Sequence, residues 1–144
     1  QVNGSERPIY NDKKCATTKI KPGMVLSIAS ATTVAPVASA DALTSRMIAV
    51  EASWENTDQS VLVSEHEYAI GDTVNFVYAQ PGDLVYLRVS ASQTVSIGSA
   101  LATSGTAGEV SVETTNKDAT IIALAEEAVS TGVGETKRVK ARII

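Results

Sequence analysis

His66 is the residue whose surroundings most resemble those of a catalytic group. It is the only histidine, and Glu65 and Glu67 flank it, so a general base and carboxylates that could orient it lie together. Nucleophilic catalysis also needs an activated nucleophile, such as the serine of a Gly-x-Ser-x-Gly turn, and the chain has no such turn. We therefore interpret His66 as a solvated surface side chain.

Three other patterns resemble functional sites in composition but not in spacing. The pair Glu126-Glu127 has the carboxylates of a glycosidase, whose chemistry depends on their separation in space. The run GVGETK at 132–137 lacks the spacing of a phosphate-binding loop and leads into a strand pattern. The run ENTD at 55–58 lacks the ligand spacing of a calcium loop. The sequence thus predicts a protein that is not an enzyme and uses no cofactor or metal ion.

Cys15 is the only cysteine, so the chain can form no internal disulfide. One cysteine and one histidine also cannot assemble a zinc cluster. We expect the thiol to be inert.

Length and composition predict one β-rich domain. A chain of 144 residues buries roughly 68–70% of the surface that it exposes when unfolded. Aromatic residues make up only 4%, so the core must consist mainly of Val, Ile, Leu and Ala. The chain shows neither a signal-peptide pattern nor an apolar run that could span a bilayer, so we expect synthesis in a cytosol and no membrane partner.

Charge is unevenly distributed along the chain. The net charge is −4, yet residues 1–22 carry five basic and two acidic side chains, and residues 137–144 carry four basic and no acidic ones. The two basic ends flank an acidic body, and they are either solvated faces or surfaces that dock on an acidic partner. Nucleic-acid binding is not expected, because the basic terminal run has no aromatic neighbours and the body would repel phosphate.

From Gly23 onward, apolar residues recur at every second position, which is the period of a strand. The face formed by Val85, Leu87 and Val89 lies opposite Arg88 in this pattern. Four more runs predict strands in the same way: MVLSIA, RMIAVEASW, TVNFVYA and KRVKARII.

The stretch Gly71–Val89 predicts a hairpin. Pro81 sets φ for the first corner position and Gly82 tolerates a positive φ, so Gln80–Asp83 suits a type II turn between two antiparallel strands.

Two features of the second half leave alternatives open. The run Ala119–Val129 contains helix formers at helical spacing, but it is also apolar enough to be a strand buried on both faces. In addition, PGMVLSIAS followed by RMIAVEAS matches IGSALATSGTAGEVSVE followed by TIIALAEEAVS, which suggests an internal duplication.

Residues 1–22 follow neither the strand nor the helix period. They mix Asn, Asp, Lys, Thr and Pro, which predicts an extended N-terminal arm at 1–22 ahead of a body at 23–144. An arm of this kind usually needs a partner to order it.

The order of the strand runs resembles that of the head decoration, or cement, proteins of tailed bacteriophages. Along residues 22–144 this order is PGMVLSIA, RMIAVEASW, YAIGDTVNFVYAQPGDLVYLRV, IGSALATSGTAGEV, IIALAEEA and KRVKARII. The resemblance implies a mostly-β body, a small β-barrel or β-tulip-like domain with an extended N-terminal arm. It also favours a strand at 119–129.

The resemblance further implies a structural virion protein that binds the outer surface of an assembled phage capsid and stabilises it. Such proteins are commonly homotrimers, made in the host cytoplasm, and their partner is the major capsid protein. The arm would grip the capsid through Arg7, Tyr10, Lys13, Lys14, Lys19 and Lys21.

The alternative function is another β-rich virion component or a carbohydrate-recognition module. Sugar binding normally requires exposed aromatic platforms, and Trp54 with four tyrosines is a small supply.

Overall fold

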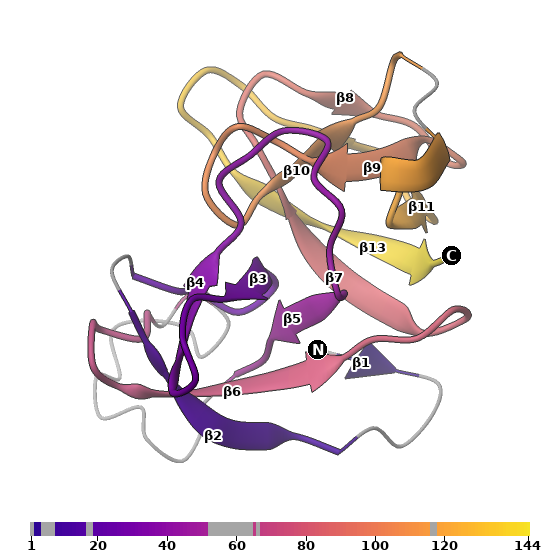
Figure 1. The fold of residues 1–144 in the computed structure, drawn as a ribbon. Coiled ribbons are helices and arrows are strands. Elements are labelled where there is room, and N and C mark those ends of the chain that lie inside the picture. The colour runs from indigo at the N-terminus through magenta and orange to yellow at the C-terminus, as the bar shows by residue number, and fades with distance from the viewer. Residues whose placement is uncertain (1, 4–7, 17–18, 52–64, 66, 116–117) are drawn as a thin grey trace.

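Strands make up almost all of the regular structure. The computed structural model describes residues 2–3, 8–16, 19–51, 65, 67–115 and 118–144, and Figure 1 shows their arrangement. The mostly-β fold class is thus confirmed. The strands are β1 (Val2–Asn3), β2 (Tyr10–Cys15), β3 (Val25–Ile28), β4 (Thr33–Pro36), β5 (Met47–Ala49), β6 (Thr73–Tyr78), β7 (Leu84–Val89), β8 (Thr94–Val95), β9 (Ala100–Thr103), β10 (Val110–Val112), β11 (Ala123–Ala125), β12 (Val129–Ser130) and β13 (Lys137–Ile143), with a 3-10 turn, η2, at Asp118–Thr120.

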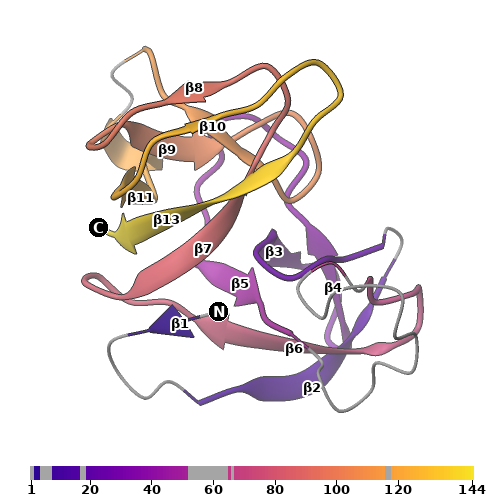
Figure 2. The ribbon, with the colours of Figure 1, turned by 180° about the vertical axis from the view of Figure 1, so that it is seen from behind.

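The strands form two five-stranded barrels. The first is closed in the order β2-β4-β3-β5-β6. The second runs β7-β10-β9-β11-β13 and is closed by six paired positions between β13 and β7, from Lys137↔Val89 to Arg142↔Leu84. Strand β1 adds to β7, and β8 pairs with β12 in a separate two-stranded sheet. Figures 1 and 2 show the first barrel below the second in both views.

The two barrels have the same topology. In each, the first strand pairs in parallel with the third (β2 with β4, β7 with β10), and every other pairing in the ring is antiparallel. Strand β3 therefore corresponds to β9, and β5 to β11. These are the strands formed by the two pairs of matching runs in the sequence, so the shared topology supports the internal duplication.

Two apolar clusters fill the molecule, and one of them joins the barrels. Inside the first barrel lie Leu26, Met47 and Phe76, among others. Their chain neighbours Val25, Ile48 and Val77 point the other way, into a larger cluster that also contains the core of the second barrel. Strand β5, the first half of β3 and the middle of β6 are therefore buried on both faces.

The alternating faces predicted for the last strands are confirmed. Val85, Leu87 and Val89 are buried inside the second barrel together with Val139, Ala141 and Ile143. The intervening side chains of β7 and β13 lie on the outer face, where Arg138 is directly opposite Arg88.

The predicted hairpin at Gly71–Val89 is wrong, although its turn is present. Gly82 has a φ of 95° and the Asp83 N–H donates to the Gln80 carbonyl at 3.0 Å. However, β6 pairs with β2 and β5, whereas β7 pairs with β1, β10 and β13. The turn is thus the corner at which the chain passes from one barrel to the other. A turn type sets the local chain direction, but strand partners far away in sequence decide the pairing.

The segment Tyr10–Cys15, which the sequence assigned to the extended arm, is a strand of the first barrel. β2 pairs with β4 on one edge and β6 on the other. Its register with β6 shifts between Tyr10 and Lys13, so an irregularity interrupts the alternation of its side chains. The period-two signal is absent because Cys15 is the one fully buried side chain of β2, while the backbone pairing is retained.

The ambiguous run at 119–129 contains strand β11 and no α-helix. η2 precedes β11, which pairs with β9 and β13 and buries Ala123 and Ala125. A strand, the alternative favoured by the resemblance, is thus present at 123–125, but it is not buried on both faces, because Leu124 is 38% exposed.

Candidate partner-binding surface

The predicted capsid-gripping residues do not form one continuous basic surface. Arg7 lies outside the described residues. Tyr10, at the start of β2, stacks on Phe76 with ring centroids 5.8 Å apart and meets the edge of Tyr78 at 5.3 Å, yet 41% of it stays exposed. Tyr10 is thus both a packing residue and an accessible aromatic surface.

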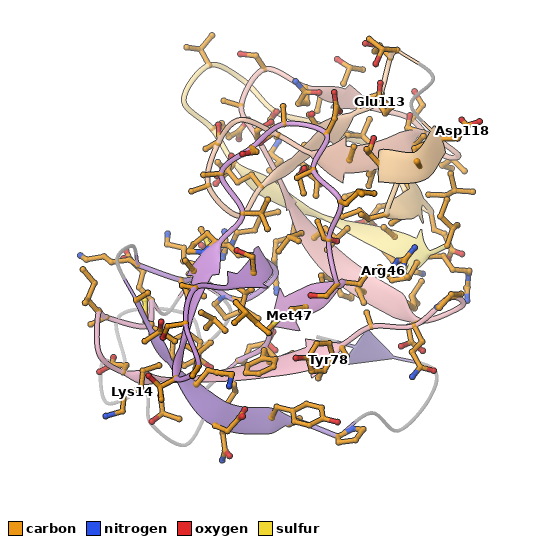
Figure 3. All side chains as sticks on the ribbon, in the orientation of Figure 1. Lys14, Arg46, Met47, Tyr78, Glu113 and Asp118 are labelled. Atoms are coloured by element: carbon orange, nitrogen blue, oxygen red, sulfur yellow. The ribbon has the colours of Figure 1, made fainter. Side chains whose placement is uncertain are left out.

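Lys13 and Lys14 behave differently although they are adjacent. The Lys13 ammonium donates to the Ala31 carbonyl at 2.6 Å and lies 3.4 Å from an Asp12 carboxylate oxygen, with 17% of the side chain exposed. Lys14 is exposed, and its side chain points away from the first barrel in Figure 3. Lys14 is therefore the lysine of β2 that can reach another molecule without breaking internal bonds.

Lys19 and Lys21 each have an internal acidic partner. The Lys19 ammonium lies 3.7 Å from Glu67, and the Lys21 ammonium lies 3.7 Å from Glu65. These pairs reduce the net charge that the N-terminal segment presents to a partner. Ion pairs exposed to this degree contribute little to stability, so a competing acidic surface can replace them.

The basic face of β13 is also largely neutralised within the chain. The Arg138 guanidinium lies 3.3 Å from a Glu51 carboxylate oxygen and sits 5.7 Å from the centroid of the Tyr86 ring. Arg142 pairs with Glu126 and donates a second bond to the Gly82 carbonyl at 2.9 Å. The bond from Arg142, with its charge, holds the pKa of Glu126 below its usual value. The basic side chains of the C-terminal run thus form ion pairs and hydrogen bonds within the chain.

A buried arginine ties the two barrels together. Arg88, 2% exposed, donates through Nε to the Pro22 carbonyl at 2.8 Å and lies 3.1 Å from Glu65 through its terminal nitrogen. The Arg88 N–H donates to the Gly23 carbonyl. The Pro22-Gly23 corner that enters the first barrel is therefore held on the outer face of β7.

The other chemical candidates are occupied by structural bonds or lie outside the described residues. His66, Trp54 and the run 55–58 lie outside them. Glu126 bonds Arg142, while Glu127 accepts the Lys140 N–H at 2.7 Å. In the 132–137 loop, Glu135 accepts the Gly132 N–H at 2.8 Å, a bond that lowers the pKa of Glu135.

Cys15 is buried in the first barrel. Within the described ranges, no three His, Cys, Asp or Glu side chains gather as metal ligands would. The same residues include no helix that is long and apolar enough to cross a membrane.

Ile9, Tyr10 and Lys14 define what we call the β2 surface. Ile9 is 63% exposed and precedes the exposed ring of Tyr10, while Lys14 adds a cation near the other end of the strand. Exposed aromatic side chains are enriched at protein-binding surfaces, and the cation at the other end of the strand could pair with an acidic partner. The polar composition of residues 1–22 pointed to this segment, but only the internal bonds of Lys13 separate the two adjacent lysines.

A second exposed feature has no counterpart in the sequence analysis. The segment from Asp41 to Arg46, between β4 and β5, carries Leu43 with 80% exposure and two residues with positive φ, at its two ends. No periodicity or motif marks these residues, because their conformation depends on contacts with distant strands.

No protein-family model matches the chain, and a search of curated proteins found no match.

Proposed function

We propose that the chain is a structural virion protein that decorates the outer surface of a tailed-phage capsid and stabilises it. The observation that carries the proposal is the order of the strand-forming runs. Each run that resembles the decoration proteins supplies strands of the two barrels: β3, β5, β6 with β7, β9 with β10, β11, and β13. The resemblance therefore involves the whole body and not one isolated turn.

The β2 surface is the proposed contact with the major capsid protein. Ile9 and Tyr10 offer an apolar and aromatic area, and Lys14 offers a cation that is free to pair with a capsid carboxylate. Arg7 would extend this surface. Lys19 and Lys21 would join it by exchanging their internal acidic partners for carboxylates of the capsid protein. Lys13 is the member of the predicted set that stays with its internal acceptors.

Stabilisation follows from mass action. A protein that binds assembled capsomers better than separated ones favours the shell by its binding free energy at every site. Many equivalent sites multiply this effect, and the decorating protein needs no catalytic group. The proposal includes a homotrimer and a location on the capsid exterior.

The test is co-sedimentation of the purified protein with undecorated capsid shells of candidate tailed phages, beside a light-scattering measurement of its mass in solution. The proposal expects saturable co-sedimentation and a mass of three chains. A protein that stays in the supernatant with every shell and instead binds glycans contradicts the proposal and supports the carbohydrate-recognition alternative.

A charge reversal tests the β2 surface itself. Lys14→Glu should weaken attachment by about tenfold or more, because it places a like charge against the capsid carboxylate. The matched control is Lys137→Glu, which reverses an exposed lysine at the start of β13 that pairs with Glu135. Equal loss of attachment in both variants would show that only net charge matters and would refute the β2 surface.

A further inference from the structure

Two turns of the same construction lead into the last strands of the two barrels. Residues 69–72, with the sequence Ala-Ile-Gly-Asp, precede β6, and residues 132–135, Gly-Val-Gly-Glu, precede β13. In each turn the third residue is a glycine with positive φ, 90° at Gly71 and 70° at Gly134, and the residue before it has no positive φ. This is the pattern of a type II turn. Because β6 and β13 are equivalent in the duplicated topology, the two turns are equivalent as well.

The acidic residue that ends each turn bonds to the start of the same turn. The Asp72 carboxylate accepts the Ala69 N–H at 2.9 Å, and the Asp72 N–H donates to the Ala69 carbonyl at 3.0 Å. The Glu135 carboxylate accepts the Gly132 N–H at 2.8 Å, and the Glu135 N–H donates to the Gly132 carbonyl at 3.2 Å. The same pair of bonds therefore holds both turns in the same shape.

The tip of each turn presents one branched aliphatic side chain to solvent. Ile70 is 62% exposed and Val133 is 96% exposed, and neither belongs to the apolar clusters of the barrels. Proline suits this position of a type II turn, and Pro22 and Pro81 precede the positive-φ glycines of two other turns. An exposed aliphatic residue there supplies neither the φ restraint of proline nor packing within the chain. Its presence in both barrels points to a contact outside the chain.

The charged groups beside the second tip are bonded within the chain. The Lys137 ammonium donates to the Ser130 carbonyl at 2.9 Å and lies 3.4 Å from a Glu135 carboxylate oxygen. A partner therefore meets Val133 as an apolar contact.

Both tips lie on the same side of the molecule. The turns ahead of β6 and β13 project to the left in Figure 1 and to the right in Figure 2, one from each barrel. The β2 surface adjoins the first of these turns, because Lys14 pairs with Thr73 and the Gly71 N–H donates to the Cys15 carbonyl at 2.9 Å. Figure 3 shows Lys14 on this side too. A cation and two apolar tips thus share one side.

We infer that this side is the docking face, and that Ile70 and Val133 insert into equivalent apolar pockets on two neighbouring copies of the capsid protein. Tips of the same shape fit pockets of the same shape, and a shell of identical subunits repeats one pocket at regular intervals. The shared apolar cluster joins the barrels, so contact at both tips gives tighter attachment than either tip gives alone. The inference rests on the proposed function, because the shell supplies the repeated pockets.

The experiment is co-sedimentation with the undecorated capsid shell to which the wild type attaches, using Ile70→Thr, Val133→Thr and the double variant. Threonine keeps the branch at Cβ but places a hydroxyl in the apolar pocket. Each single variant should raise the dissociation constant for the shell by about tenfold, and the double variant by about a hundredfold, since the free energies of separate contacts add. Their melting temperatures should equal that of the wild type, because both side chains are exposed.

Ile97→Thr is the matched control. Ile97 is 74% exposed and precedes Gly98, which has a φ of 86°, so the substitution makes the same chemical change in the same kind of turn. The turn ahead of β9 projects to the opposite side, to the right in Figure 1 and to the left in Figure 2. This variant should therefore attach as the wild type does.

Ionic strength separates the tips from the cation of the β2 surface. The effect of Lys14→Glu on attachment should shrink as salt is raised, because salt screens exposed charges. The effect of the double threonine variant should persist, because an apolar contact is not screened.

The outcomes separate the inference from the decoration function. Wild-type attachment by either tip variant would overturn docking at two points, and an equal loss in Ile97→Thr would show that the effect is not specific to this side. A lowered melting temperature in a tip variant would contradict the inference as well, since the side chain would then pack within its own barrel. Each of these results leaves the decoration function in place. A wild type that binds no shell overturns that function and the inference with it.

Discussion

Gly23 and Gly82 occupy the same kind of corner but have different surroundings. Each follows a proline and has a positive φ, 87° and 95° respectively. A Cβ on Gly82 would meet nothing within 4 Å, whereas a Cβ on Gly23 would lie 2.8 Å from the Tyr86 carbonyl oxygen. Gly23 therefore permits the close approach of the first barrel to β7.

Gly23→Ala should destabilise the protein more than Gly82→Ala does. Both substitutions place a side chain at positive φ, which costs about 1–2 kcal/mol. Gly23→Ala also forces two backbone segments apart, which adds about 1–3 kcal/mol. Urea unfolding of both variants measures the difference, and equal losses would contradict the steric role assigned to Gly23.

Glu109 makes stability depend on pH. It is 8% exposed, and burial raises the pKa of its carboxyl above the usual value although Arg88 and Lys21 oppose the shift. A group with a raised folded pKa stabilises the fold fully below its unfolded pKa, and this contribution is lost as pH rises through the folded value. Ionised Glu109 is therefore unfavourable near neutral pH.

Glu109→Gln should raise the melting temperature at about pH 7 and have little effect at about pH 3, where the carboxyl is protonated in both states. The measurement is thermal unfolding followed by circular dichroism at both pH values. A rise in melting temperature of the same size at both pH values would show that packing, and not charge, causes the effect.

At the scale of the elements, the place of β2 in the first barrel changes the expected result of an N-terminal truncation. An extended arm at 1–22 would leave a folded body when removed, but β2 closes the first barrel through two neighbours. Deleting residues 1–21 should therefore unfold that barrel as well as abolish attachment, because β4 and β6 lose their shared partner.

Circular dichroism and thermal melts of the truncated protein test this expectation. The control is deletion of residues 1–8, which keeps Tyr10–Cys15 and should retain a cooperative transition. A stable, cooperative 22–144 fragment would instead restore the arm interpretation.

The elements also show the limits of sequence patterns. The alternation in KRVKARII predicted both faces of β13 correctly, since one face of the strand is buried and the other is more exposed. The same reasoning missed β2, because only Cys15 of its six side chains is fully buried and the strand shows no apolar alternation. It also paired β6 with β7, because a turn sequence does not report which partners the flanking strands find.

At the scale of the whole molecule, the shared apolar cluster couples the barrels. Val25, Ile48 and Val77 from the first barrel pack in the same cluster as Leu101 from the second. Cys15, 2% exposed inside the first barrel, can report on this coupling through its reactivity with a thiol reagent.

Leu101→Ala should increase the labelling rate of Cys15 in the native protein, although the two residues belong to different barrels. The lost packing lowers the free energy of unfolding by about 2–5 kcal/mol. Because a cooperative molecule unfolds as one unit, the free energy of the opening that exposes Cys15 falls by the same amount. The rate of labelling with a disulfide reagent is the readout. An unchanged rate alongside a lowered melting temperature would mean that the barrels open independently.

The sequence by itself determined the mostly-β class, the inward and outward faces of the long strands and the pairs of matching runs that mark the duplication. These properties follow from local periodicity and composition, which act on neighbouring residues. The tertiary structure alone decided the assignment of β6 and β7 to different barrels, the inclusion of β2, the internal bonds of Lys13 beside an exposed Lys14, and the buried Nε of Arg46, which has no acceptor among the described residues. Each of these depends on which distant segments meet, and that is set by the joint burial of apolar faces and the pairing of backbone groups across the whole chain.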